Sequence, residues 1–251
     1  MSAITPIDAC ARCGAAVRRE IPADLTGVWR ERAATMPLVC ARCAQRRSAD
    51  DAEQERRRAE EAGRRDAARR LRSCGLPERL RAARLASVDG PEHQRAARRW
   101  VAGELLGLVL SGPVGTGKTW TAAAAARAMV AHRRVAWTSA PLLLAWLGAG
   151  IGSARHAAAL ELITGRTALV LDDADKARPS DYGAEQLFLA VDARVEHRRP
   201  LLVTTNLTLG ELAARYPQPY GEAIASRLAG YCEHVELTGP DRRMDGIGGE
   251  R

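Results

Sequence analysis

The chain has 251 residues, of which 46% are hydrophobic and 27% are charged, and its formal net charge is +8. This content is enough for a globular protein with one large domain, or a moderate domain and a small appendage. The longest apolar stretch, SAPLLLAWLGAGIG, is short and broken by Pro and Gly, and the first residues lack the layout of a signal peptide. These features exclude a membrane span and predict a cytoplasmic protein whose thiols stay reduced.

The positive charge is unevenly distributed. The whole excess lies in the first 100 residues, while residues 101–251 are neutral overall. Clustered cations suit a nucleic acid or an acidic protein partner. The alternative is compositional, because 36 arginines against two lysines indicate a genome-wide bias, and a run of charges is usually a solvated face. Both interpretations stay open at this point.

Two Cys-x-x-Cys pairs, each reading CARC, lie at residues 10–13 and 40–43. Together they can supply four thiolates to one tetrahedral Zn²⁺. All five histidines lie at position 93 or later, so a local metal site would consist of Cys10, Cys13, Cys40 and Cys43. Iron–sulfur ligation or a redox-active pair without metal is the alternative. We predict a zinc-binding domain over residues 1–48 that depends on its metal for folding.

Residues 45–73 are predicted to form a highly charged helix. Glu53 with Arg57 and Asp66 with Arg70 are spaced i,i+4 in the favoured order. The segment has no leucine stripe, which favours a solvated connector over a coiled coil, and the following Gly and Pro end the helix. We assign residues 49–72 to this linker and residues 73–251 to the main domain.

The main domain alternates short apolar runs with helical patterns. This alternation predicts an α/β fold in which helices flank a five-stranded parallel sheet. The expected strands are residues 105–111, 134–139, 167–172, 200–206 and 232–237. Helices are expected between them, notably over residues 118–132 and 182–199.

Residues 112–119, GPVGTGKT, follow the first expected strand and begin a helix, and they fit the pattern G-x-x-x-x-G-K-[ST]. Backbone N–H groups of such a loop wrap phosphates, and the helix N-terminus adds positive potential. A compact ammonium such as Lys118 fits between the β- and γ-phosphates of ATP, where a planar guanidinium is too wide. Thr119 is expected to bind Mg²⁺. The expected ATP-binding residues of this phosphate loop are Gly112, Pro113, Val114, Gly115, Thr116, Gly117, Lys118 and Thr119.

The third expected strand ends in two acidic residues. Asp172 is expected to hold Mg²⁺ through water, and Asp173 to activate the attacking water. Asn206, at the end of the fourth strand, is a candidate to orient that water, although an Asn at a strand end is usually a turn residue. Lys176 lies in a polar loop and is expected to face solvent.

These features in this order resemble the AAA+ ATPases and, more narrowly, the DnaC/DnaI/IstB group of helicase loaders and transposition helper ATPases. The resemblance covers residues 76–243 and includes GLPERL, TSAPLLLAWL, LVLDDADK, LLVTTN, ASRL and GPDRR. One departure is Asp173, which replaces the glutamate usual across AAA+ proteins, although two aspartates are common in the loader group. The shorter side chain implies slow hydrolysis.

The resemblance also implies roles for several arginines. Arg227 is the candidate arginine finger that reaches the ATP of a neighbouring subunit, and no acidic partner for it is obvious in the sequence. Arg243, or less favourably Arg242, corresponds to the late arginine that touches phosphate in its own subunit. Arg155 and Arg166 lie in the helical insertion that contacts single-stranded DNA in loaders, where few aromatic residues are available for stacking.

The resulting hypothesis is an ATPase that forms a homo-oligomer and loads a replicative helicase onto single-stranded DNA during replication, with ATP, Mg²⁺ and Zn²⁺ as its ligands. In loaders of the DnaI kind an amino-terminal zinc domain binds the helicase. The alternatives are an IstB-like transposition helper that acts on a transposase, and a zinc-dependent DNA-binding regulator that ATP switches. A P-loop nucleoside kinase is disfavoured because it needs neither Asn206 nor an arginine from another subunit.

Overall fold

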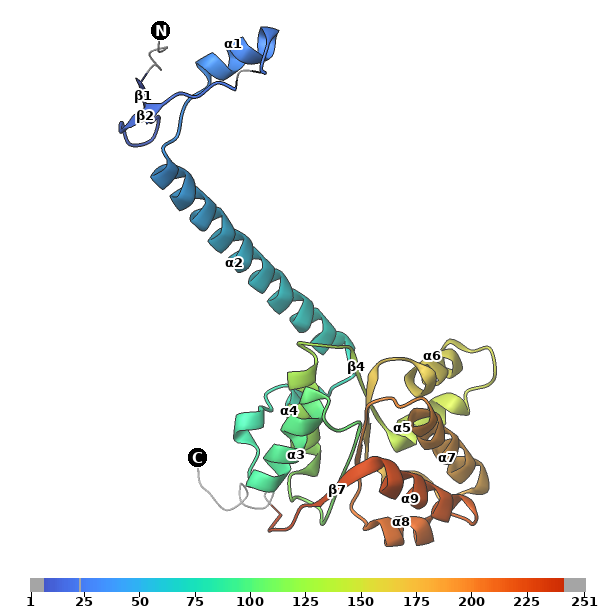
Figure 1. Cartoon of the computed structure of the whole chain (residues 1–251). Coiled ribbons are helices and arrows are strands. Elements are labelled where there is room, and N and C mark those ends of the chain that lie inside the picture. The colour runs from blue at the N-terminus through green and yellow to red at the C-terminus, as the bar shows by residue number, and fades with distance from the viewer. Residues whose placement is uncertain (1–6, 23, 242–251) are drawn as a thin grey trace. The chain divides into compact units, whose positions relative to one another are not determined.

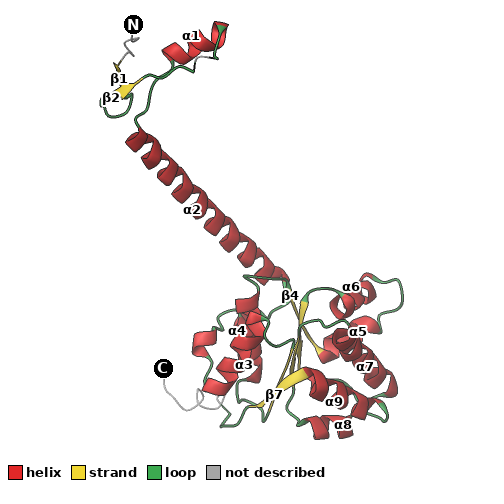
Figure 2. Cartoon of the chain, viewed as in Figure 1, coloured by secondary structure: helices red, strands yellow, loops and turns green. Residues whose placement is uncertain are grey.

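The computed structural model describes residues 7–22 and 24–241, whose helices and strands are shown in Figures 1 and 2. The chain divides into two compact units, Met1–Gly63 and Arg64–Arg251. Within the described residues, no helix combines the length and the apolar character needed to cross a bilayer.

The first unit contains a small hairpin followed by two helices. Strands β1 (Ile7–Ala9) and β2 (Ala16–Arg18) pair antiparallel. Helix α1 (Gly27–Thr35) buries none of its residues, and α2 (Ala41–Ser73) continues into the second unit. With so little apolar burial, this unit needs a stabilising element other than a hydrophobic core.

Helix α2 confirms the predicted charged helix but begins at Ala41, four residues earlier than expected. The second CARC pair therefore straddles its start, and Cys43 lies in its first turn. Arg57 and Arg56 both contact Glu53, at 2.8 and 2.7 Å, and Arg70 pairs with Asp66. Each of these exposed pairs stabilises the helix by only about a few tenths of a kcal/mol. Such pairs are the local support available to a solvated helix that has no leucine stripe.

The second unit is an α/β domain with a five-stranded parallel sheet. The strands are β3 (Gly107–Ser111), β4 (Val135–Ser139), β5 (Ala168–Asp172), β6 (Leu201–Thr204) and β7 (Cys232–Glu236). The helices are α3 (Pro91–Ala102), α4 (Lys118–Met129), α5 (Ala140–Leu147), α6 (Ala154–Thr164), α7 (Asp181–Glu196), α8 (Leu209–Arg215) and α9 (Tyr220–Tyr231). Short 3₁₀ turns lie at Glu78–Leu80, Leu85–Ser87 and Ala174–Lys176.

The strand order is β4-β5-β6-β3-β7, and all neighbouring strands pair parallel, which confirms the predicted five-stranded parallel sheet. Leu108 and Leu110 of β3 pack with α3 and α4, while Val109, between them in sequence, packs in a second core with α5, α7 and α9. Both faces of the sheet are therefore covered, and Figure 1 shows α3 and α4 on one side and α5 to α9 on the opposite side. This is why the strands read as continuous apolar runs rather than as an alternating pattern.

The run of five alanines in α4, residues 122–126, lets this helix lie close to the sheet. Each of the five is at most 1% exposed. A helix with small residues on all sides fits between α3 and the sheet, where larger side chains would overpack the core. The position of α4 matters because its first residue, Lys118, ends the loop that leaves β3.

Candidate functional site

The phosphate loop connects the C-terminal end of β3 to the N-terminus of α4. Gly112, Gly115 and Gly117 have φ values of 129°, 82° and 98°, a region that only glycine adopts without strain. A Cβ on Gly112 would lie 2.1 Å from the carbonyl oxygen of Leu237, and one on Gly115 would lie 1.8 Å from Oδ1 of Asp241. Gly112 and Gly115 are therefore required because the segment after β7 packs closely against them. This requirement is independent of any ligand.

Lys118 is buried, with 5% of its surface exposed, despite its charge. Its Nζ donates hydrogen bonds of 2.6 Å to the carbonyl oxygens of Gly112 and Pro113. These bonds hold the ammonium against the loop that carries it. The N-terminus of α4 lies at the same point, so backbone N–H groups and a fixed cation converge there, as an anion-binding site requires.

The carboxylate of Asp172 lies next to the start of α4 and is 8% exposed. Oδ1 accepts hydrogen bonds from Oγ1 of Thr119 at 3.1 Å and from Oγ1 of Thr204 at 2.6 Å. Burial raises the pKa of Asp172 above its usual value, and the hydrogen bond from Thr204 opposes that shift. A carboxylate and a hydroxyl in contact are hard oxygen donors of the kind that Mg²⁺ prefers, so this pair fits the ion.

Asp173 adopts a left-handed conformation with φ of 55°, and its backbone N–H donates to Oγ1 of Thr204 at 2.9 Å. Thr204 thus bridges both acidic residues from the neighbouring strand, a role that sequence reasoning missed. Within residues 7–22 and 24–241, no hydrogen bond or ion pair engages the Asp173 carboxylate. Asp173 lines the pocket described next and is available to a water molecule there.

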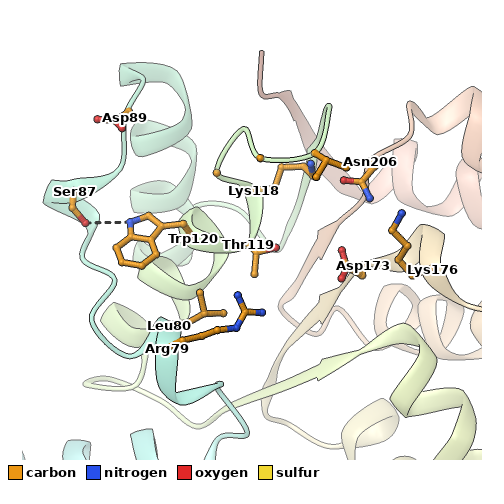
Figure 3. A pocket seen from close by; sticks show the side chains of 13 residues that line it. Arg79, Leu80, Ser87, Asp89, Lys118, Thr119, Trp120, Asp173, Lys176 and Asn206 are labelled. Atoms are coloured by element: carbon orange, nitrogen blue, oxygen red, sulfur yellow. Dashed lines mark hydrogen bonds between the residues drawn. The ribbon is translucent and has the colours of Figure 1, made fainter. Parts of the chain in front are cut away.

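A cavity of about 530 Å³ opens beside the phosphate loop. Figure 3 shows Asp173, Lys176 and Asn206 gathered at one end, Ser87 and Trp120 at the other, and Lys118 and Thr119 between them, with the guanidinium of Arg79 below Thr119. Trp120 Nε1 donates to Ser87 Oγ at 3.3 Å. The volume lies within the range of small-molecule sites, about 300–1,000 Å³.

Asn206, which lines the cavity, contacts a buried acidic residue that sequence reasoning missed. Asp175 is 4% exposed and accepts hydrogen bonds from the backbone N and from Nδ2 of Asn206, at 2.8 and 3.0 Å. Burial opposes ionisation of Asp175, but the hydrogen bonds from Asn206, together with the contact and the charge of Lys176, outweigh it and lower the pKa of the carboxyl. Lys176 is exposed, as expected, but it also lines this cavity and lies 3.2 Å from Oδ2 of Asp175.

Arg227 does not line the cavity. It lies on α9, and its Nε is 2.7 Å from Oδ1 of Asp192, with Nη1 3.6 Å from Oε1 of Glu196. The absence of an obvious acidic partner in the sequence was therefore misleading, since packing of α9 on α7 brings in two carboxylates. The Arg227 side chain stays 43% exposed beside a hollow of about 400 Å³ that Phe188 and other residues of α7 and α9 line.

The structure describes the positions of two of the remaining candidate arginines. Arg155 and Arg166 are exposed, at the start of α6 and just beyond its end. Arg243, with its neighbour Arg242, lies outside the described residues. The phosphate contact expected for Arg243 therefore stays a prediction.

In the first unit, the four cysteine sulfurs lie within 4.8 Å of one another, and we call them the cysteine cluster. Cys10 and Cys13 belong to the turn after β1, and Cys40 and Cys43 to the start of α2. Sγ of Cys13 and Sγ of Cys40 are 3.6 Å apart. Zn–S bonds of about 2.3 Å place tetrahedral sulfurs about 3.8 Å apart, so the cluster fits Zn²⁺.

Backbone donors already favour thiolate chemistry in this cluster. The N–H of Cys40 donates to Sγ of Cys10 at 3.3 Å, and this bond, followed by those of Arg12 and Cys13, lowers the pKa of Cys10 to about 6. Hydrogen bonding with Cys13 and then Cys40 raises the pKa of Cys43 to about 12. Without metal, the four thiols therefore do not all ionise, whereas a bound cation would stabilise every thiolate.

Comparisons with known proteins place these features in context. Residues 94–245 match the family described as IstB-like ATP binding protein. No match is found among curated proteins.

Solved structures resemble the chain over about two thirds of its length. The crystal structure of DnaI is 25% identical with a TM-score of 0.58, covering 67% of this chain and 94% of that one. The DnaC helicase loader is 23% identical with a TM-score of 0.57, covering 64% and 100%. The replication initiator DnaA bound to AMPPCP and single-stranded DNA is 18% identical with a TM-score of 0.53, covering 66% and 51%.

Proposed function

Because the chain belongs to the family of IstB-like ATP-binding proteins, we propose that it is an ATP-dependent loader that places a ring-shaped replicative helicase on single-stranded DNA. The observation that carries the proposal is the pairing of a phosphate-loop cavity with a separate unit built on the cysteine cluster. The likeness to the DnaC helicase loader and to DnaI supports it.

ATP binds with its phosphates on the phosphate loop, where Lys118 and the N-terminus of α4 face them. Thr119 and Asp172 hold Mg²⁺, which neutralises phosphate charge when bound. Asp173 accepts the proton of the attacking water. Asn206 donates its Nδ2 to Asp175, and this fixes the amide with Oδ1 available to accept a hydrogen bond from the same water.

The active site is completed by a second copy of the chain. Arg227 lies outside the cavity of its own subunit and stays half-exposed, so it is suited to reach a nucleotide on a neighbour. A cation placed where charge develops on the γ-phosphate accelerates hydrolysis. The ion pair with Asp192 fixes the stem of Arg227 without covering it. We therefore place ATP hydrolysis in a homo-oligomer.

The first unit holds Zn²⁺ and recruits the helicase. Zinc in the cysteine cluster supplies the stability that this unit lacks, since α1 buries no residue. Val28 and Trp29 on α1 are 74% and 66% exposed, which suits a surface that contacts another protein. The ATPase unit binds DNA through phosphate contacts, for which Arg155 and Arg166 are the candidates, and alignment of subunits strengthens that binding.

A second candidate function is an IstB-like transposition helper, which the description of the matching family favours. The two functions differ in the protein that the chain binds. The full chain, bearing an affinity tag, is incubated with the replicative helicase or with a transposase from the same cell, and the complexes are separated by size. Retention of the helicase alone supports the loader. Retention of the transposase alone rejects it.

A further inference from the structure

Lys176 stands out because the chain's two lysines both line the same cavity. The chain has 38 basic residues, and the described lining of the cavity contains three of them: Arg79, Lys118 and Lys176. Elsewhere the chain uses arginine throughout. The chain thus has lysine in place of its usual arginine at two positions, and both positions line this cavity. Lysine differs from arginine in being a compact point charge on a flexible stem, which suits contact with a phosphate oxygen in a confined space.

The backbone that carries Lys176 is fixed from three sides. Lys176 ends the 3₁₀ turn Ala174–Lys176, directly after Asp173. The hydroxyl of Tyr216 donates to the carbonyl oxygen of Ala174 at 2.5 Å, and Nε of Arg215 donates to the carbonyl oxygen of Asp175 at 3.0 Å. The hydrogen bonds between Asp175 and Asn206 tie the turn to the end of β6.

The ammonium at the tip of this fixed turn is free to exchange partners. Lys176 is 53% exposed, and its contact with Asp175 is 3.2 Å long. The same oxygen, Oδ2, already accepts a hydrogen bond from Asn206, so Asp175 keeps a partner when the lysine leaves. Water screens the charge of the half-exposed ammonium, and a triphosphate is a stronger competitor for this cation than a single carboxylate.

The position of Lys176 identifies which phosphate it meets. In Figure 3 it lies with Asp173 and Asn206 at one end of the cavity, and Lys118 and Thr119 lie between this end and Trp120. A nucleotide whose phosphates cross Lys118 therefore directs its terminal phosphate toward Asp173 and Lys176. The opposite end, with its aromatic side chain, is the end that suits the nucleoside.

We propose that Lys176 contacts the γ-phosphate of ATP bound in its own subunit and is a catalytic residue of hydrolysis. This inference rests on the proposed assignment of the phosphate loop as the triphosphate site. During hydrolysis the water oxygen bonds to the γ-phosphorus, the bond to the bridging oxygen breaks with its electrons retained by ADP, and a water proton passes to Asp173. Lys176 offsets the negative charge on the γ-phosphate oxygens through this step.

Discrimination between ATP and ADP tests this inference, because ADP lacks the phosphate that Lys176 contacts. The full chain is titrated with ADP and with the non-hydrolysable analogue AMPPNP, each with Mg²⁺, by calorimetry, and ATP turnover is measured in parallel. Lys176→Ala and Lys176→Gln are expected to weaken AMPPNP binding about tenfold, the loss typical of one charge-assisted hydrogen bond, and to leave ADP binding within about twofold. Turnover falls in both variants.

Arg178→Ala is the matched control, because it removes an exposed cation two residues away that does not line the cavity. It is expected to change neither affinity. Equal weakening of AMPPNP and ADP by the Lys176 variants, or no weakening of either, overturns the inference. Lys118→Ala separates this failure from that of the proposed function. If the wild-type chain binds no nucleotide, or if Lys118→Ala binds both normally, the triphosphate site itself is misassigned and both proposals fall.

Discussion

Arg194 on α7 is 0% exposed, and among the residues that the structure describes no carboxylate pairs with its guanidinium. Its guanidinium instead donates to five backbone carbonyl oxygens, those of Leu162, Ile163, Gly165, Thr167 and Pro200. These carbonyls belong to the end of α6 and to the segments that enter β5 and β6. Burial lowers the pKa of Arg194 to about 10, so the side chain is still cationic at neutral pH.

We expect Arg194→Met to destabilise the second unit strongly. Hydrogen bonds to a charged group contribute about 1.5–3 kcal/mol each, but five carbonyls share one cation and their contributions do not add. A buried carbonyl oxygen left without a donor costs about 1–3 kcal/mol, and the substitution leaves more than one. Nε is buried with no hydrogen-bond partner among the described residues, which offsets part of this loss, so we expect a total of about 3–4 kcal/mol.

The assay is urea unfolding followed by tryptophan fluorescence, with thermal unfolding in parallel. A loss of this size lowers the Tm by about 6–16 °C in a domain of this length. Arg98→Met is the control, because Arg98 is exposed on α3, and we expect it to change the free energy of unfolding by less than about 0.5 kcal/mol. A loss below about 1 kcal/mol for Arg194→Met would show that water replaces the guanidinium and would refute the reasoning.

Four further predictions follow from the candidate sites. Cys40→Ser should release one Zn²⁺ per chain and unfold the first unit while nucleotide binding persists, as checked by elemental analysis and calorimetry; a wild-type chain that holds iron or no metal contradicts this. Asp173→Asn should bind ATP but hydrolyse it at least about tenfold more slowly, so wild-type turnover would show that another group activates the water. Arg227→Ala should bind ATP yet lose hydrolysis, and mixing it with Lys118→Ala should restore part of the rate; no rescue at any ratio argues for a site complete in one subunit. Deletion of residues 1–72 should abolish helicase binding and spare ATP-dependent binding of single-stranded DNA, and the reverse pattern would favour the DNA-binding regulator.

The sheet was predictable because its strands are buried on both faces. Runs such as 105–111 and 167–172 are largely apolar, and all five observed strands begin and end within two residues of the predicted limits. Strand β6 ends at Thr204 because Asn206 turns away to bind Asp175. The phosphate loop was likewise readable, since its glycines, lysine and threonine are contiguous in sequence.

Contacts between distant segments could not be read in this way. Thr204 reaches Asp172 only because β6 lies beside β5, and nothing in the sequence marks a threonine as a partner of a carboxylate 32 residues earlier. The partners of Arg227 depend in the same way on how α9 packs against α7. The polar residues around Lys176 correctly indicated an exposed loop, but they did not show that this loop borders the cavity.

The central claim is that ATP bound at the phosphate loop drives the loading of a helicase, and a loading assay on closed circular single-stranded DNA tests it most directly. The DNA is incubated with the ring-shaped replicative helicase, the full chain and ATP, and the helicase retained on the circle is measured. We predict retention that needs both the chain and ATP, and that is lost with Lys118→Ala. Helicase retention that is equal with wild-type chain, with Lys118→Ala and with no chain would contradict the account.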